Sequence, residues 1–434
     1  MGYATRVFTV LLAHLAFVVA AAGSGGGGGS GGSILGQLAL EKVLHDGREV
    51  FGEFVNDHNN NNDESVDSPS FLPSRPALPH HGQGRHARWM AALPDAIPLA
   101  RLTIPGTHDA ATWNYSQATQ DGLSGATRCD GAGPARGPAR AYRCQTRSLA
   151  AALEAGVRFL DLRFAADPTG ARLALWHGPA LLSARATLED VLLGLYAWLD
   201  AHPTETVLAS LQHERGTRAD DGDADDAAVV RDALRRALTG PAAARYVVGA
   251  RGALGTLGEA RGKVVVLRRF DLDEHDHDHD DNDDDTSSSS LLPGLHLSPT
   301  KWPDNAPAGF ELVYNETTGA RAFVEDYYHP EGPEHATVAA NVEAKFAAAA
   351  DHLRKAAAGD FDSLFITFTS GTHVEAEPPV YPDVMALGTH AVRGVNARLR
   401  DLLAGPEMRG RRLGVVVMDF FDEPDGLVDL LLDL

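Results

Sequence analysis

Short apolar runs alternate with longer helical patterns along most of the chain, from about residue 89 onward. The runs are rich in Val, Ile, Leu and Phe and end at glycine, proline or a charged residue, which is typical of strands buried on both faces. We predict strands at Ala100–Ile104, Val157–Phe164, Leu173–Trp176, Thr206–Leu211, Lys263–Arg269, Ala320–Tyr327, Ser363–Thr369 and Leu413–Phe420. We predict helices at Leu149–Ala155, Thr187–Ala201, Ala224–Leu238, Ala336–Ala358 and Ala386–Leu403.

Strands that alternate with helices in this way favour an α/β fold, in which a parallel sheet is covered by helices on both faces. The strand candidates above suffice for a (β/α)8 TIM-type barrel, which we expect to be distorted or partly open. The barrel is predicted to cover residues 86–434, with an acidic insertion at about residues 271–290. That insertion alternates Asp with His and then runs into Asp and Ser, so we expect a solvated, disordered segment rather than a metal site.

The first 85 residues do not share the barrel pattern. Residues 1–22 contain Arg6, then an apolar stretch, then small residues, which predicts a signal peptide and a secreted protein. Residues 23–85 predict a flexible, low-complexity segment, although a short amphipathic piece occurs at Ile34–Phe54. Two glycosylation sequons, at Asn114 and Asn315, agree with secretion.

The charge of the chain excludes one class of partner. The net charge is −21, and ten acidic residues between Asp271 and Asp285 account for much of it. No basic tract is present that could contact phosphates along a nucleic acid, so we expect no nucleic-acid partner.

Only two cysteines occur, Cys129 and Cys144, on either side of a loop rich in Gly, Pro and Arg. In an exported chain this pattern favours a single disulfide, and two separate thiols are the alternative. A structural metal site is not favoured, since no further ligands occur at suitable spacing.

Polar side chains follow the predicted strands, where a (β/α)8 barrel carries its active site. His108 and Asp109 follow the first strand, Arg163 ends the second and His177 ends the third. The later strand ends add Gln212, Arg269, Asp326, Tyr328 and Asp419. Two imidazoles with carboxylates and a guanidinium suit general acid–base attack on a phosphate ester.

These pieces, in this order, resemble the single-domain phosphatidylinositol-specific phospholipase C enzymes of bacterial type and their secreted fungal relatives. The resemblance covers roughly residues 90–434 and rests on Ile104–Asp109, Gly156–Arg163, Trp176–Gly178, His202–Thr206, Ser210–Glu214, Gly262–Arg269, Val324–Asp326, Phe365–Thr369 and Gly414–Asp419.

The resemblance implies a role for each catalytic candidate. His108 would be the general base for the inositol 2-hydroxyl, and His177 the general acid for the diacylglycerol oxygen. Asp419 would orient His108, and Asp109 would assist His177. Arg163 would neutralise the phosphate at the strand end where calcium-dependent relatives offer metal-binding carboxylates, so we expect neither a metal ion nor another cofactor.

The resemblance also implies how the headgroup is recognised and where the enzyme works. Arg269, Asp326 and Tyr328 would bind the inositol, and Gln212 stands where the best-known bacterial members have lysine. We expect a monomer that contacts the membrane surface peripherally. Because the chain is acidic, apolar rim residues would provide that contact, with Trp113, Trp302 and Phe310 as candidates.

Two other functions remain open at this point. One is a metal-dependent phosphodiesterase of the glycerophosphodiester type, which needs a carboxylate set that Arg163 interrupts. The other is a secreted barrel that binds headgroups without turnover, which has no need of two acid–base histidines.

Overall fold

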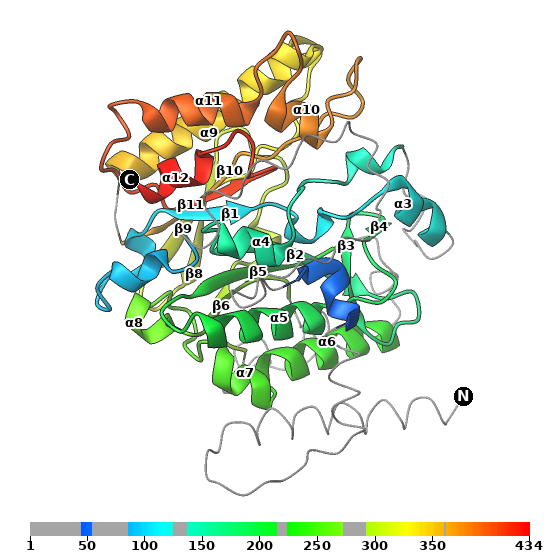
Figure 1. Cartoon of the computed structure of the whole chain (residues 1–434), viewed down its shortest axis with the longest axis vertical. Coiled ribbons are helices and arrows are strands. Elements are labelled where there is room, and N and C mark those ends of the chain that lie inside the picture. Colours follow the sequence, from blue (N-terminus) through cyan, green and yellow to red (C-terminus); the bar gives the residue numbers. More distant parts are fainter. Residues whose placement is uncertain (1–44, 54–85, 125–136, 215–223, 272–291, 360–361) are drawn as a thin grey trace, which may run out of the picture.

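The structure is a computed structural model that describes residues 45–53, 86–124, 137–214, 224–271, 292–359 and 362–434 (Figure 1). The predicted signal peptide and nearly all of the acidic insertion lie outside these residues. Within them, one mixed sheet of eleven strands forms the centre of the molecule. The strands are β1 (Ile104–Thr107), β2 (Phe159–Ala166), β3 (Leu173–His177), β4 (Ala180–Leu181), β5 (Val207–His213), β6 (Val264–Arg269), β7 (Leu295–His296), β8 (Phe310–Asn315), β9 (Ala320–Glu325), β10 (Leu364–Phe368) and β11 (Val415–Met418).

Most strands follow one hydrogen-bonded path in the order β7-β6-β5-β2-β1-β11-β10-β9-β8. All neighbours on this path are parallel except β8, which runs antiparallel to β9. The two ends of the path, β7 and β8, do not pair with each other in the part of the chain that the structure describes. The predicted α/β barrel is therefore confirmed in a partly open form.

One predicted barrel strand is wrong. Leu173–His177 forms β3, which pairs antiparallel with β2 as a hairpin, and β7 is a parallel strand that we did not predict. A parallel neighbour of β2 needs a crossover of about a dozen residues or more. Only residues 167–172 separate β2 from β3, and Asp167 closes that turn by accepting from the backbone amide of Ala171 at 2.9 Å.

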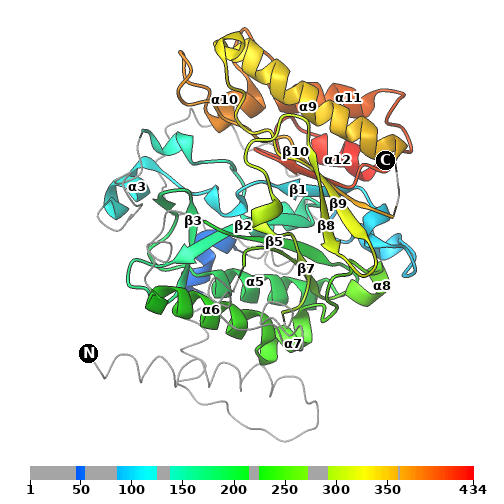
Figure 2. The ribbon, with the colours of Figure 1, turned by 180° about the vertical axis from the view of Figure 1, so that it is seen from behind.

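Helices cover both sides of the sheet (Figures 1 and 2). In these views α5, α6 and α7 lie on the side of β2, β5 and β6, and α9, α11 and α12 lie on the side of β10, β11 and β1. The helices are α3 (Gln117–Leu123), α4 (Leu149–Glu154), α5 (Leu188–Ala201), α6 (Ala224–Thr239), α7 (Pro241–Tyr246), α8 (Leu257–Ala260), α9 (Val338–Ala358), α10 (Pro382–Leu387), α11 (Val395–Ala404) and α12 (Leu427–Leu432).

The helix predicted at Ala386–Leu403 is two helices, α10 and α11. Gly388 interrupts it with φ of +86°, a conformation that favours glycine. A Cβ atom at Gly388 would lie 2.1 Å from the carbonyl oxygen of Val392, so the turn between the two helices requires glycine there. The periodicity of the flanking residues concealed this break.

Alternate residues of the strands face two different cores, as the period of a strand requires. On β11, Val415 and Val417 belong to the apolar cluster inside the barrel, whereas Val416 and Met418 pack in the cluster beneath the helices. The barrel interior is thus filled by side chains. This leaves the carboxyl ends of the strands as the face on which polar groups can gather.

Residues 45–53 of the amphipathic piece before the barrel lie within the described residues. Residues 45–51 are helical, and both Val50 and Phe51 are buried. The Phe51 ring lies so close to Gly194 of α5 that a Cβ atom there would come within 2.5 Å of it. For these residues the expectation of a flexible segment does not hold. Among the described residues, no helix is long and apolar enough to cross a membrane.

Candidate active site

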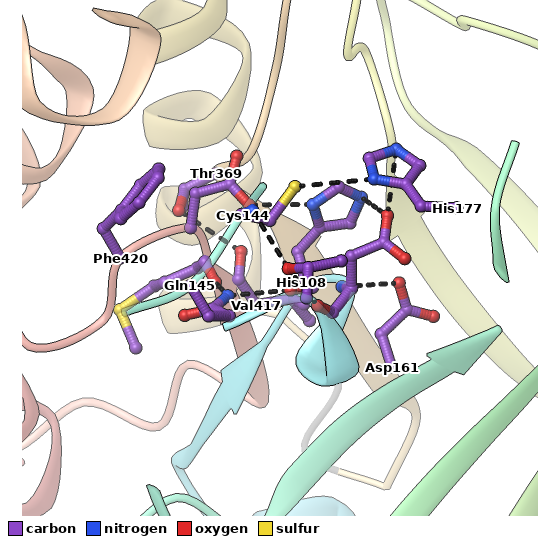
Figure 3. Close-up of polar contacts among 12 residues, drawn as sticks. His108, Cys144, Gln145, Asp161, His177, Thr369, Val417 and Phe420 are labelled. Carbon is purple, nitrogen blue, oxygen red and sulfur yellow. Dashed lines mark hydrogen bonds and ion pairs between the residues drawn. The ribbon is translucent and has the colours of Figure 1, made fainter. Parts of the chain in front are cut away.

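The predicted catalytic residues meet at the carboxyl ends of the strands. His108 and Asp109 directly follow β1, Asp419 directly follows β11, and Arg163 lies on β2. His177 ends the antiparallel strand β3, and it reaches the same place because the β2–β3 hairpin returns over this face. The two imidazole rings are 6.1 Å apart between centroids (Figure 3).

His108 lies between a carboxylate and a guanidinium. Its Nδ1 is 2.8 Å from Oδ1 of Asp419, and its Nε2 is 2.7 Å from Nη2 of Arg163. Because arginine can only donate hydrogen bonds, Nε2 must be the acceptor and Nδ1 the donor to Asp419. The contacts therefore fit a neutral imidazole whose lone pair points into the site.

Whereas Nε2 of His108 must accept a hydrogen bond, the ring nitrogens of His177 lie where hydrogen-bond donors are needed. Its Nδ1 is 2.8 Å from the carbonyl oxygen of Tyr142, and its Nε2 is 3.2 Å from Oδ2 of Asp109. Both nitrogens thus face oxygen atoms. Burial raises the pKa of Asp109 against the opposing charge of Arg163. Whether the proton belongs to His177 or to Asp109, it lies between them and is available to a leaving group.

The backbone at Asp109 brings this carboxylate between both rings. Asp109 has φ of 41°, in the left-handed region that few residues other than glycine adopt. Its amide donates to Oδ2 of Asp161 at 3.2 Å, and its Oδ2 is 3.4 Å from Nε2 of His108. Strained backbone of this kind is concentrated at functional sites.

Arg163 is surrounded by acceptors. Its Nε lies 3.1 Å from Asp161 and 3.4 Å from Asp109, and its Nη1 lies 3.3 Å from Glu214. Burial works to lower the pKa of Arg163, but these carboxylates outweigh it and raise the pKa well above its ordinary value. Arg163 is therefore a permanent cation at the centre of the site.

The candidate headgroup residues form the adjoining part of the site. Strand register aligns Arg163, Gln212 and Arg269 on three neighbouring strands. The Arg269 guanidinium lies 3.7 Å from the centroid of the Trp302 ring, and Trp302 donates its indole N–H to Asp326 at 2.9 Å.

Tyr328 stands further out on the same rim. It donates its hydroxyl to Asp304 at 2.7 Å and is partly exposed. The structure thus brings all nine predicted catalytic and headgroup residues to one face.

Part of this region matches a known family. Residues 139–270 match the sequence profile of the family described as phosphatidylinositol-specific phospholipase C, X domain. This stretch of the chain is therefore similar to a phosphatidylinositol-specific phospholipase C X domain. The matched residues include Arg163, His177, Gln212 and Arg269, whereas His108 and Asp419 lie outside them.

Curated relatives match over a similar stretch. A 1-phosphatidylinositol phosphodiesterase of Listeria monocytogenes is 34% identical over 132 residues, which are 30% of this chain and 34% of the relative. The PI-PLC X domain-containing protein 1 of Homo sapiens is 28% identical over 155 residues, 32% of this chain and 46% of the relative. The match therefore spans less than half the length of these relatives.

A solved structure extends the likeness of fold beyond the X domain. A mutant of phosphatidylinositol-specific phospholipase C from Staphylococcus aureus superposes with a TM-score of 0.57 at 19% identity. The superposition covers 81% of this chain and 98% of that one. The barrel fold is thus shared well beyond residues 139–270.

Four residues of the site were not among the predicted site residues. Asp161 and Glu214 are acceptors around Arg163; Asp161 lies on β2, Glu214 directly follows β5, and neither had a role assigned from the sequence. Gln145 donates to the carbonyl oxygens of His108 and Met418, at 2.7 and 2.9 Å, and so joins β1 to β11. No sequence motif around Gln145 or Trp302 indicated that these residues belong to the site.

The predicted disulfide is not present, because Cys144 carries a free thiol. The thiol is buried, with Sγ 3.9 Å from Nδ1 of His177 (Figure 3). Burial, together with the charges of Asp419 and Asp109, raises the pKa of Cys144, so the thiol is neutral. Its predicted partner Cys129 lies outside the described residues. The spacing of the two cysteines predicted a disulfide that closes the loop between them, but it could not show that Cys144 faces the site.

The residues predicted for the apolar rim are partly buried in packing contacts, and their contact with lipid stays a prediction. Trp302 packs on Arg269 and on Phe310, with the two aromatic centroids 5.2 Å apart. Trp113 donates its indole N–H to the carbonyl oxygen of Val50 at 2.6 Å. Each ring packs beneath neighbouring segments and is only partly exposed. Among the described residues, the one large apolar side chain classed as exposed is Val374.

Proposed function

We propose that the protein is a phosphatidylinositol phosphodiesterase of the phospholipase C type. It would convert phosphatidylinositol, or the related glycosylated inositol lipid, to diacylglycerol and inositol 1,2-cyclic phosphate. One observation carries this proposal: Asp109 lies between two histidines with opposite hydrogen-bonding requirements, directly beside Arg163.

In the proposed reaction His108 acts as the general base. Nε2 takes the proton of the inositol 2-hydroxyl, whose oxygen attacks the phosphorus and forms the cyclic ester. Asp419 accepts a hydrogen bond from Nδ1 and so stabilises the imidazolium that results. His177 gives a proton to the diacylglycerol oxygen as its bond to phosphorus breaks.

Arg163 would supply the positive charge that the transition state needs. A guanidinium can donate to two phosphate oxygens at once, and its charge does not depend on pH near neutrality. Its contacts with Asp109, Asp161 and Glu214 occupy the carboxylates that a divalent cation would otherwise bind. This arrangement supports chemistry without a metal ion.

The substrate would lie with its inositol toward Arg269, Gln212 and Asp326 and with Tyr328 at its edge. Oε1 of Gln212 is buried without a hydrogen-bond partner among the described residues, so it can accept from an inositol hydroxyl. The relatives named above carry phosphatidylinositol in their names, which agrees with this substrate class.

Further parts of the proposal rest on sequence alone. The pattern at residues 1–22 favours export, and the two sequons favour glycosylation in the export pathway. We expect a monomer that meets lipid at the membrane surface, with the carboxyl-end face of the barrel directed to the bilayer.

Lipid cleavage in the presence of a chelator tests the proposal. Purified protein is incubated with phosphatidylinositol vesicles and EDTA, and the water-soluble product is identified by phosphorus NMR. We expect inositol 1,2-cyclic phosphate and diacylglycerol. Release of free inositol together with phosphatidic acid, or activity that returns only with a divalent cation, would favour the metal-dependent enzyme, and binding without turnover would favour the headgroup-binding barrel.

A further inference from the structure

Two histidines and a glutamate gather outside the candidate active site, on the loops that follow β9 and β10. The side chains of His329, His373 and Glu375 each offer a ligand atom, and these atoms lie within 4.8 Å of one another. Nε2 of His329 is 3.7 Å from Oε2 of Glu375, and the two imidazole centroids are 4.6 Å apart. No residue of this cluster takes part in the proposed lipid cleavage.

A buried amide determines which nitrogen of His373 is free. Asn341 of α9 donates its NH2 group to the carbonyl oxygens of His335 and Thr337, so its Oδ1 must be the acceptor in its third contact. That contact is with Nδ1 of His373, at 2.9 Å. Nδ1 of His373 therefore carries the proton, and the lone pair is on Nε2. A protein oxygen that holds one nitrogen of a histidine is the usual arrangement behind a metal ligand.

We propose that His329, His373 and Glu375 form a site for a divalent ion of the Zn²⁺ class. Two imidazoles and a carboxylate are a known zinc ligand set, whereas Ca²⁺ and Mg²⁺ prefer oxygen ligands alone. Metal–ligand bonds of about 2.0–2.2 Å require ligand atoms roughly 3.3 Å apart. Side-chain rotation of Glu375, which is 69% exposed, can close its present 3.7 Å separation from Nε2 of His329 to that value. Water would complete the coordination.

The ion would join two loops of the barrel rim. The loops already touch, since the amide of Thr372 donates to the carbonyl oxygen of Tyr328 at 2.8 Å. A Cβ atom at Gly371 would lie 2.9 Å from that same oxygen, so the two backbones pass very closely. A metal ion on His329 and His373 would hold this contact closed. If the proposed function is correct, it would also hold Tyr328 in position for the headgroup.

Metal titration tests the site without any lipid assay. Because His275, His277 and His279 can bind metal adventitiously, the full chain is prepared with all three changed to Ser. Zn²⁺ affinity is measured on chelator-treated protein by competition with a chromophoric chelator, and Co²⁺ is used for its visible absorption in tetrahedral sites. We expect one Zn²⁺ per chain, a tetrahedral Co²⁺ spectrum and a higher melting temperature with Zn²⁺.

Variants in the same background identify the ligands. His373→Gln and Glu375→Gln should each weaken Zn²⁺ binding by about 100-fold or more, since even indirect support of a ligand contributes about 10–100-fold. The control is His390→Gln, because His390 is exposed and outside the cluster; it should bind like its parent. Loss of all binding in the triple-Ser background, or equal affinity in His373→Gln and the control, would overturn the proposal. A failed lipid assay would not affect this result.

Discussion

Nη2 of Arg163 lies 2.7 Å from Nε2 of His108, so the guanidinium donates to the nitrogen lone pair with which His108 would act as the base. The contact favours neutral His108. Burial also works to lower the pKa of His108, but the carboxylates of Asp419 and Asp109 outweigh both effects, and the pKa is raised. A phosphate that attracts Arg163 would expose the lone pair to the inositol hydroxyl. Substrate binding would thereby prepare the base.

Arg163→Lys tests this coupling. Lysine keeps the charge but lacks the planar fork of donors with which a guanidinium can contact phosphate and His108 together, so we expect kcat to fall about 100-fold or more. Arg172→Lys is the matched control, because Arg172 is also paired with a carboxylate, Asp167, but lies outside the site. Equal activity of the two variants, at equal melting temperature, would contradict the role of Arg163.

Substrate chemistry distinguishes the two histidines. A phosphoinositol ester with a nitrophenol leaving group departs without protonation, so it should restore most of the activity of His177→Ala. It should not restore His108→Ala, because the 2-hydroxyl still needs a base. We expect both variants to lose about 10²–10⁴-fold on the natural lipid. If the nitrophenol ester restored His108→Ala instead, His108 would be the general acid and His177 the general base. If it restored neither variant, the assignment of both histidines would be contradicted.

The pH profile reports on Asp419. A base must be deprotonated, so activity should rise with pH through the raised pKa of His108. Asp419→Asn removes the carboxylate that does most to raise this pKa, so the acidic limb should move to lower pH while the maximal rate also falls. Asp422→Asn, which alters a surface pair with Arg147, should leave the limb in place. If the acidic limb of the pH profile does not move in Asp419→Asn, that limb reports the titration of a group other than His108.

Much of the site was accessible from the sequence because strand ends are local features. His108, Asp109, Arg163 and Asp419 each stand at the end of an apolar run, and parallel strands bring such ends together. His177 was also expected at this face and lies there, but the expectation rested on a wrong premise. Its strand is antiparallel, which the short turn before it could have indicated.

The rest depended on contacts between distant segments, which a sequence pattern does not contain. Gln145 joins β1 to β11 from a loop without a recognisable motif. The sequence suggested Trp113 and Trp302 as rim residues, because it does not show that their indole N–H groups donate to Val50 and Asp326. Likewise, β7 is too short for its periodicity to be read.

The helical segment at residues 45–51 yields the last prediction, because its contacts are those of a structural element. Phe51 is 3% exposed and packs on Gly194, so Phe51→Ala should destabilise the fold by about 3 kcal/mol. Glu53→Ala is the control, since Glu53 is exposed and such surface changes cost within about 0.5 kcal/mol.

Chemical denaturation measures the stability of both variants, and limited proteolysis compares how readily the segment is cleaved. Below the melting transition, kcat should change by no more than about 2-fold in Phe51→Ala, since His108 and His177 take none of their hydrogen bonds from this segment. If Phe51→Ala and Glu53→Ala unfold at the same denaturant concentration, the segment does not pack on α5 in solution. Its contacts with Trp113 would then contribute nothing to the barrel.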